Sequence, residues 1–287
     1  MNHIFTAKLG KLLFPILGSV IIALTCITNP TPPDTDTASV RHVKTYAIDD
    51  AYITGQGYDS DDDFFYSSGA ISAFKAAGIA KIDKSTNRII AANCFALPKE
   101  LKEKGSDHIG DITVQNGIIY APVEDETEED PCILLYSADT LEYTGICYEL
   151  DTEFLDDGIP WCASDDNYLY TSTFHSTDKI LAFNLSDMSL SHVITLSRQI
   201  DRNQAGDVFD GTLYMNCDPH EGNKEVYAVD LATGETRLLF DRATTGLTET
   251  ETEGMCVYSD PEGKVYFRIL DYNKIISTIV REYRCSQ

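Results

Sequence analysis

The chain has 287 residues, enough for one large domain or two modest ones, and its 43% apolar and 24% charged residues are typical of a globular protein. Its 46 acidic and 22 basic residues give a formal net charge of −24, which repels a phosphate backbone. The composition therefore excludes a disordered chain and a nucleic-acid-binding protein.

The amino-terminal segment has the layout of an export signal. Two lysines precede an apolar run that begins at Leu12, and no charged residue follows until Asp34. Small residues just before Cys26 offer a cleavage site, while the run is also about as long as the ~20 residues that span a bilayer. Residues 1–28 are interpreted as a signal peptide or a membrane anchor, with a lipoprotein as a third alternative. Each predicts a secreted or extracytoplasmic protein, with membrane contact only through residues 12–28.

The eight cysteines show no C-x-x-C or zinc-like spacing, which argues against a thiolate metal site. Cys132 and Cys147 flank a predicted hairpin made by residues 133–136 and 143–146. In an antiparallel hairpin they would lie nearly opposite each other, so they are the candidate disulfide. The alternative is two buried free thiols.

Five similar units follow along the chain. Each has a polar anchor, a short strand, a turn rich in Asp, Asn and Gly, and a second strand that carries a tyrosine. The five tyrosines are spaced by 54, 50, 44 and 52 residues, and they are Tyr66, Tyr120, Tyr170, Tyr214 and Tyr266. Turns such as Asn116-Gly117 and Asp210-Gly211 are strong hairpin signals because both central residues need positive φ. A second hairpin in each unit completes the four strands of a propeller blade.

The predicted fold is an all-β, five-bladed β-propeller that occupies residues 41–287, after a proline-rich linker at 29–40. The fifth unit supplies only three clear strands, and the run 42–48 is expected to add the outer strand and close the ring. A sixth blade would require irregular strands within residues 67–78. A short helix is expected at 98–104.

A family resemblance rests on the first unit. Residues 55–58, the strand with Tyr66-Ser67-Ser68-Gly69 and residues 82–86 resemble the first blade of the five-bladed glutaminyl cyclase-like propellers. The whole repeat region is similar to uncharacterised exported propellers whose blades begin with a polar residue and glycine. The resemblance implies a propeller fold and offers cyclase activity as one function.

The anchors are the candidate site, because the first strand of each blade lines the centre of a propeller and the anchors would meet at one mouth. This set is expected to bind a small polar ligand, a peptide or a glycan, and it comprises Gln56, His108, Trp161, Gln204 and Glu253. The alternative is a structural ring that binds only ordered water. Trp161 is expected either to stack on a sugar or peptide ring or to pack between blades.

Glu253, Asp111 and Asp207 are the candidate oxygen ligands for calcium. His108 is a candidate acid or base. Two functions follow: an exported binding or scaffold module, or a propeller-type hydrolase or glutaminyl cyclase-like enzyme in which Glu253 and His108 share proton transfer. The acidic stretch 59–63 lacks the glycine and the final glutamate of a calcium loop and is interpreted as a solvated hairpin turn.

Overall fold

The computed structural model describes residues 40–47, 54–71, 76–123, 130–150, 152–155, 157–219, 223–242, 250–273 and 277–285. The predicted signal or anchor segment and nearly all of the proline-rich linker lie outside these residues. Within the described part of the chain, no helix has the length and apolar character needed to cross a membrane.

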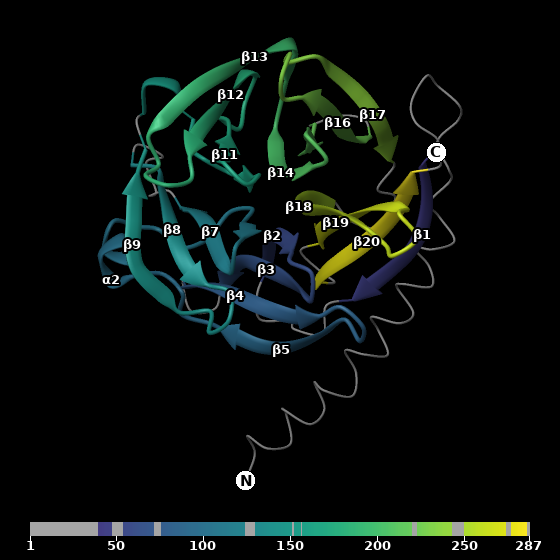
Figure 1. The fold of residues 1–287 in the computed structure, drawn as a ribbon. Helices are drawn as coiled ribbons and strands as arrows, with labels where there is room; N and C mark the ends of the chain where they lie inside the picture. Colours follow the sequence, from purple (N-terminus) through teal and green to yellow (C-terminus); the bar gives the residue numbers. More distant parts are fainter. Residues whose placement is uncertain are drawn as a thin grey trace.

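The described residues form five four-stranded antiparallel sheets arranged around a common centre (Figure 1). From the inside outward, the first blade has β2 (Thr54–Ser60), β3 (Phe64–Ile71), β4 (Ala76–Asp83) and β5 (Arg88–Asn93). The second has β6 (Thr113–Gln115), β7 (Ile118–Val123), β8 (Cys132–Ser137) and β9 (Tyr143–Glu149). The third has β10 (Ala163–Ser164), β11 (Tyr168–Thr171), β12 (Thr177–Asn184) and β13 (Leu190–Ile200). The fourth has β14 (Asn203–Phe209), β15 (Thr212–Cys217), β16 (Lys224–Asp230) and β17 (Thr236–Arg242).

The fifth blade joins the two ends of the described chain. Its strands, again from the inside outward, are β18 (Thr250–Ser259), β19 (Val265–Asn273), β20 (Ser277–Cys285) and β1 (Val40–Ala47). β1 pairs with β20 from Val40 opposite Cys285 to Ala47 opposite Ile279. The predicted closure of the ring is thus confirmed, and the outer edge of β20 is covered.

Local signals in the sequence match the strands and turns. In each of the first four blades, the tyrosine that marks the repeat unit pairs with a residue of the innermost strand at the equivalent position of the hairpin. The pairs are Asp59–Tyr66, Thr113–Tyr120, Ala163–Tyr170 and Asp207–Tyr214. Asn116 and Gly117 have φ of 53° and 76°, and Asp210 and Gly211 have φ of 50° and 73°, as the hairpin prediction requires.

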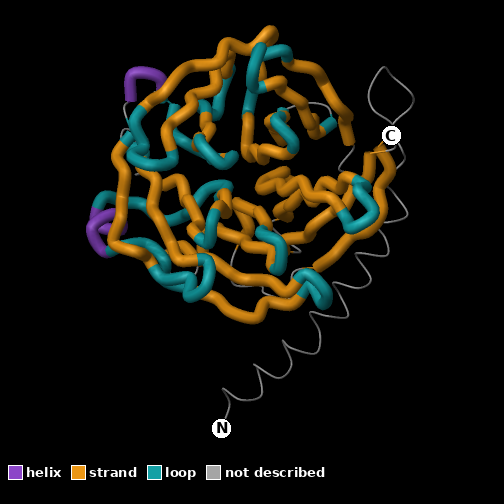
Figure 2. Tube along the Cα trace, in the orientation of Figure 1, coloured by secondary structure: helices purple, strands orange, loops and turns teal. Residues whose placement is uncertain are grey.

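The sixth-blade alternative is not supported, because β3 and β4 form one regular hairpin from Phe64–Asp83 to Ile71–Ala76. The expected helix is present as α2 (Lys99–Glu103). It and the 3-10 helix η2 (Thr152–Phe154) lie at the periphery of the ring (Figure 2).

The apolar core is divided among the interfaces between neighbouring blades. One cluster of buried side chains joins the third and fourth blades and includes Trp161, Ile180 and Met215. Other clusters join the first to the second, the second to the third, the fourth to the fifth and the fifth to the first blade. Each blade is therefore stabilised by two neighbours, and closing the ring gives the first and fifth blades their second interface.

The centre of the ring is crowded. A methyl group on Gly57 would lie 2.7 Å from the carbonyl oxygen of Gly110, and one on Gly254 would lie 2.7 Å from Cα of Gly57. These positions exclude a side chain, as expected where inner strands converge.

The candidate disulfide is not present. Cys132 on β8 is opposite Glu149, and Cys147 on β9 is opposite Leu134, so the two cysteines are diagonal neighbours. Both are free thiols, Cys132 buried and Cys147 exposed, and their side chains share a hydrogen bond. The predicted proximity is correct, whereas the bridge is not formed in this structure.

We expect diamide, a two-electron oxidant, to join Cys132 to Cys147. Each thiol loses its proton, and the sulfurs together lose two electrons, which reduce diamide to its hydrazine. A bridge that closes a loop of about 15 residues should stabilise the fold by about 3 kcal/mol. Peptide mass mapping before and after oxidation, with urea unfolding, measures both effects. Cys147→Ser should prevent the change and Cys94→Ser should not; an unchanged peptide map would contradict the expectation.

Candidate functional site

The ring brings two of the predicted anchors together. Glu253 lies on β18, the innermost strand of the fifth blade, and the residue is only 3% exposed. Gln56 on β2 is half-buried, and its side-chain amide donates a hydrogen bond to the Glu253 carboxyl group. Because β2 and β18 are the first and last inner strands, this contact forms only when the ring is closed.

Two cations from the fourth blade stand near this carboxyl group. The buried Asp218 carboxylate holds both of them: Arg202 Nη2 lies 3.6 Å from Asp218 Oδ2, and Lys224 Nζ contacts Asp218 Oδ1. Burial, with Glu251 nearby, raises the pKa of Glu253 well above its usual range, although Arg202, Gln56 and Lys224 oppose the shift. Burial, followed by the charges of Arg242 and Arg202, lowers the pKa of Lys224.

Asn216 completes the arrangement. Its amide nitrogen donates to Thr252 Oγ1 at 2.9 Å and to the carbonyl oxygen of Glu253 at 2.6 Å. Its Oδ1 atom is buried and has no hydrogen-bond partner within the described residues. A buried acceptor without a donor costs about 1–3 kcal/mol, so a donor placed there would be favoured. We call Gln56, Arg202, Asn216, Lys224 and Glu253 the mouth cluster.

The other anchors do not join this cluster through any hydrogen bond found among the described residues. His108 precedes β6; its side chain is 38% exposed and its Nδ1 lies 3.0 Å from Asp107 Oδ1. Gln204 is half-buried at an irregularity in the pairing of β14 with β15.

Trp161 is completely buried, and its Nε1–H donates to Ser172 Oγ at 3.1 Å. A methyl group on Gly206 would lie 2.5 Å from the indole ring, so the ring packs closely on the fourth blade. Of the two predicted roles for Trp161, packing between blades is the one that this placement fits, because no face of the ring is open for stacking.

Asp111 and Asp207, the other candidate calcium ligands, connect blades. Asp111 Oδ1 accepts the N–H of Tyr58 at 2.8 Å, and its Oδ2 accepts the N–H of Gly206 at 3.1 Å. Asp207 Oδ2 accepts the N–H of Val257. Burial raises the pKa of Asp111 and of Asp207 well above the usual range, although these backbone bonds oppose it.

Asp59 has the same role, which corrects the interpretation of residues 59–63 as an entirely solvated turn. Its Oδ2 accepts the N–H of Val114 at 2.6 Å, and burial raises its pKa to about 7. Only Asp61 to Asp63 form the turn, where Asp61 Oδ1 caps the N–H of Asp63 at 2.8 Å. We call Asp59, Asp111 and Asp207 the aspartate pins.

The proposed calcium ligands do not fit an ion. Ca²⁺ takes six to eight oxygen ligands, and Asp111 already uses both carboxylate oxygens for backbone amides. Across the residues that the structure describes, no three His, Cys, Asp or Glu side chains lie close enough together to hold a metal.

Comparisons with known proteins support the fold. No family model matches the chain, and no curated protein matches it. The structure is similar to the glutaminyl cyclase of Myxococcus xanthus, with a TM-score of 0.59 and 11% identity over 86% of this chain and 97% of that chain. The protein is a five-bladed β-propeller.

Other propeller structures show the same level of similarity. A GH43 β-xylosidase/α-arabinofuranosidase from a compost microbial metagenome has a TM-score of 0.55 and 12% identity, over 83% of this chain and 92% of that chain. The β-xylosidase RS223 has a TM-score of 0.52 and 11% identity, over 82% and 92%. At these identities the likeness establishes the fold of the propeller and leaves its chemistry to its own residues.

Sequence reasoning found Gln56 and Glu253 but missed the rest of the mouth cluster. Arg202, Asn216 and Lys224 lie just before β14, near the end of β15 and at the start of β16. The available signal was positional, because these polar and charged residues lie at strand ends that share one end of the ring. Using that signal requires the strand boundaries to be known first.

Proposed function

We propose that the protein is an exported β-propeller that binds a small polar ligand, a peptide or a glycan at the mouth cluster. The observation that carries the proposal is Glu253, a residue only 3% exposed whose carboxyl group is bonded to Gln56 and lies within electrostatic range of Arg202 and Lys224. Export is supported by the layout of residues 1–28, a signal peptide or membrane anchor.

The chemistry of the cluster limits the ligand. Burial raises the pKa of Glu253 well above its usual range, which favours the form that donates a hydrogen bond. Arg202 and Lys224 are donors as well, so the ligand needs acceptor oxygens. The Oδ1 atom of Asn216, which has no hydrogen-bond partner in the part of the chain that the structure describes, needs a donor. A ligand with an N–H or O–H group beside a carbonyl or ether oxygen meets both demands, as peptides and sugars do.

The alternative proposal is a propeller-type hydrolase or a glutaminyl cyclase-like enzyme. Its support is the pKa of Glu253, which burial raises well above its usual range, since a carboxyl group with a raised pKa suits acid–base catalysis. His108 pairs with Asp107, and no hydrogen bond in the described part of the chain joins it to Glu253. Proton transfer would therefore depend on Glu253. Assays with glutaminyl peptides, lactones and aryl esters test this alternative, and turnover that survives Glu253→Gln would exclude the role.

We expect Glu253→Gln to weaken ligand binding by about tenfold, which is the loss of one charge-assisted or directed hydrogen bond. The replacement keeps the size of the side chain, but it puts an NH₂ donor where the carboxyl group has a second acceptor oxygen, and it cannot carry the charge that Arg202, Gln56 and Lys224 favour. Thermal-shift and calorimetric titration with a panel of amino acids, dipeptides and disaccharides measures it.

Glu142→Gln, in an exposed turn of the second blade, is the matched control and should bind as the unmodified protein does. Equal affinity of the two variants for every ligand that shifts the melting temperature would refute the mouth cluster as the site.

A further inference from the structure

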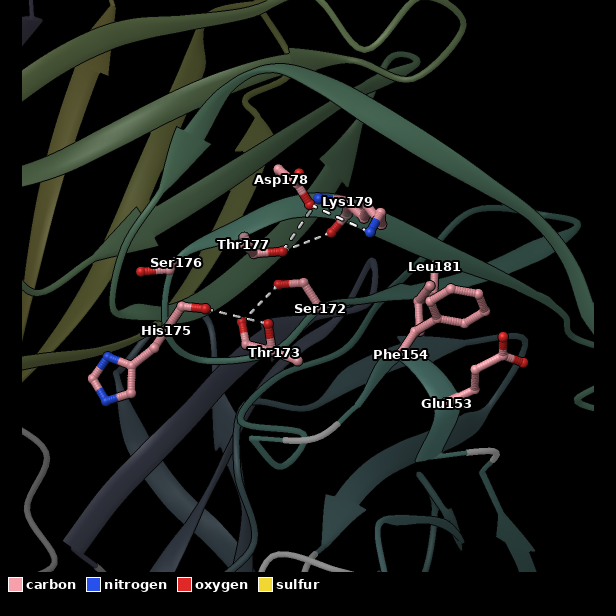
Figure 3. A pocket seen from close by; sticks show the side chains of 10 residues that line it. All are labelled: Glu153, Phe154, Ser172, Thr173, His175, Ser176, Thr177, Asp178, Lys179 and Leu181. Carbon is pink, nitrogen blue, oxygen red and sulfur yellow. Dashed lines mark hydrogen bonds and ion pairs between the residues drawn. The ribbon is translucent and has the colours of Figure 1, made fainter.

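A cavity on the third blade shares no residue with the mouth cluster. It lies between η2, the loop from β11 to β12, and the first residues of β12, and it is partly open to solvent (Figure 3). Its volume is about 350 Å³. That is at the lower end of the range of roughly 300–1,000 Å³ found for small-molecule sites, so it suits a ligand of one or two sugar rings in size.

One side of the cavity is apolar. Phe154 on η2 and Leu181 on β12 both line it, and both pack against the core between the second and third blades. Figure 3 shows the two side chains next to each other on one side of the group. A half-buried phenyl ring held by the core offers a flat face to the C–H groups of a ligand.

The opposite side carries hydroxyl groups in fixed positions. Ser172 Oγ accepts from the Trp161 indole and donates to the carbonyl oxygen of Thr173 at 3.0 Å. Thr177 Oγ1 donates to the carbonyl oxygen of Lys179 at 2.8 Å. Ser172 Oγ already accepts from Trp161, and Thr177 Oγ1 accepts the N–H of Lys179 at 3.4 Å. The two residues are 1% and 5% exposed, so each hydroxyl group keeps one acceptor position on the side that lines the cavity. Trp161, one of the predicted ligand-binding anchors, does not line this cavity itself. It holds Ser172, which does.

The loop that bears the hydroxyl groups is held in one conformation. Ser176 has φ of 48°, a region that residues other than glycine adopt only when the surroundings hold them there. Its N–H donates to Asp201 Oδ1 at 3.0 Å, and its carbonyl oxygen accepts from Gln199 at 2.7 Å. The N–H of His175 donates to Asp157 Oδ2 at 2.8 Å. A loop fixed before binding reduces the entropy that a ligand must overcome.

The rim carries charges of both signs, because Glu153, Asp178 and Lys179 all line the cavity. Lys179 pairs with Asp178 at 3.7 Å, and its ammonium group lies 6.0 Å from the centre of the Phe154 ring. The net charge of −24 disfavours an anion. A neutral ligand with many hydroxyl groups and an apolar face can use the carboxylates, the ammonium group and the aromatic ring together.

We propose that this cavity binds a neutral saccharide, with the ring on Phe154 and its hydroxyl groups bonded to the side that carries Ser172 and Thr177. Asp178 and Lys179 then accept from and donate to hydroxyl groups at the rim. The site is independent of the mouth cluster.

Saturation-transfer NMR with cellobiose, maltose, lactose and N,N′-diacetylchitobiose tests the proposal, with glucuronic acid and glucosamine as charged probes. We expect transfer to at least one neutral disaccharide in the millimolar range and none to the charged probes. Phe154→Ala should weaken that binding by roughly tenfold or more, since the stacked ring loses its apolar contact. Phe154→Tyr should retain it. The absence of transfer to every neutral disaccharide would overturn the proposal.

Phe95→Ala removes an exposed phenyl ring after β5; it is the control and should leave saccharide binding unchanged. Glu253→Gln separates this site from the mouth cluster. If Glu253→Gln removes the binding and Phe154→Ala does not, the saccharide belongs to the mouth cluster and this proposal fails while the proposed function stands. If Phe154→Ala does not fold, Asp178→Ala replaces it, because that side chain is exposed. Asp178→Ala should weaken binding several-fold, and unchanged binding would exclude the site.

Discussion

Replacing Asp271 by Asn is expected to lower the free energy of unfolding by about 3–5 kcal/mol. The side chain of Asp271 is fully buried, and its two oxygens accept from Arg242 Nη1 and Nη2 at 2.8 Å and 2.7 Å. Arg281 contacts the same carboxylate. The replacement leaves the buried guanidinium of Arg242 without its carboxylate, and the cost of an uncompensated buried charge exceeds the value of the pair itself.

The effect on stability is enlarged by the position of this buried ion cluster of Asp271, Arg242 and Arg281. Arg242 ends β17 in the fourth blade, whereas Asp271 and Arg281 lie on β19 and β20 of the fifth blade. Arg242 Nη2 also donates to Thr252 Oγ1, and Asn216 of the mouth cluster donates to the same oxygen. Loss of the carboxylate therefore loosens the junction between two blades and the support of the proposed ligand site.

Urea unfolding followed by circular dichroism measures the Asp271→Asn effect. Asp62→Asn, an exposed turn position in the first blade, is the matched control and should change stability by less than about 0.5 kcal/mol. If the two variants unfold at the same urea concentration, the buried ion cluster does not stabilise the ring as argued.

The fold was predictable because its determinants are local. An Asn-Gly or Asp-Gly turn fixes its hairpin whatever surrounds it, and the repeat of the tyrosine strands fixes the number of blades. Ring closure was also predictable, since the fifth unit lacked one strand and the run before the first unit matched it. None of these features requires knowledge of which residues meet at the centre.

The site was only partly predictable because the strand pairing shifts where the anchors lie. The pairing is irregular between Gly55 and Gly57, between Asn203 and Ala205, and between Thr252 and Met255. Such shifts change the face to which a side chain points, and an offset of one residue reverses it. Gln56 and Glu253 meet, whereas residues at similar distances from a glycine in other blades do not.

The aspartate pins were misread for a related reason. Asp59 stands next to the exposed acidic turn and has the same local context, yet its carboxylate enters the junction with the second blade. Asp111 and Asp207 resemble calcium ligands by residue type and by their position after glycine. Only the proximity of neighbouring backbone amides, which is a property of the closed ring, shows that their partners are N–H groups.

Replacing Asp111 by Ala is expected to lower the free energy of unfolding by about 2–6 kcal/mol, from about 1–3 kcal/mol for each of two buried amides that lose their acceptor. The amides belong to Tyr58 in the first blade and Gly206 in the fourth blade, so one side chain of the second blade joins three blades. Urea unfolding of the variant measures the loss. Asp107→Ala, at an exposed position in the same loop, is the control and should change little.

Asp111→Ala also removes an unfavourable interaction between carboxylates. The pH dependence of the free energy of unfolding distinguishes this electrostatic effect from the loss of the hydrogen bonds. Burial raises the pKa of Asp59 to about 7, and the charge of Asp59 in turn helps to raise the pKa of Asp111 and Asp207. A carboxyl group whose folded pKa exceeds its unfolded value stabilises the fold at low pH, and the contribution is lost as the pH rises through the folded pKa. The unmodified propeller should therefore be more stable at about pH 6 than at about pH 8, and Asp111→Ala should show a smaller difference because one of the three repelling charges is gone. If the variant is instead as stable as the unmodified protein at about pH 8, then repulsion among the aspartate pins offsets the bonds of Asp111 to the backbone, and Asp111 does not stabilise the ring as argued.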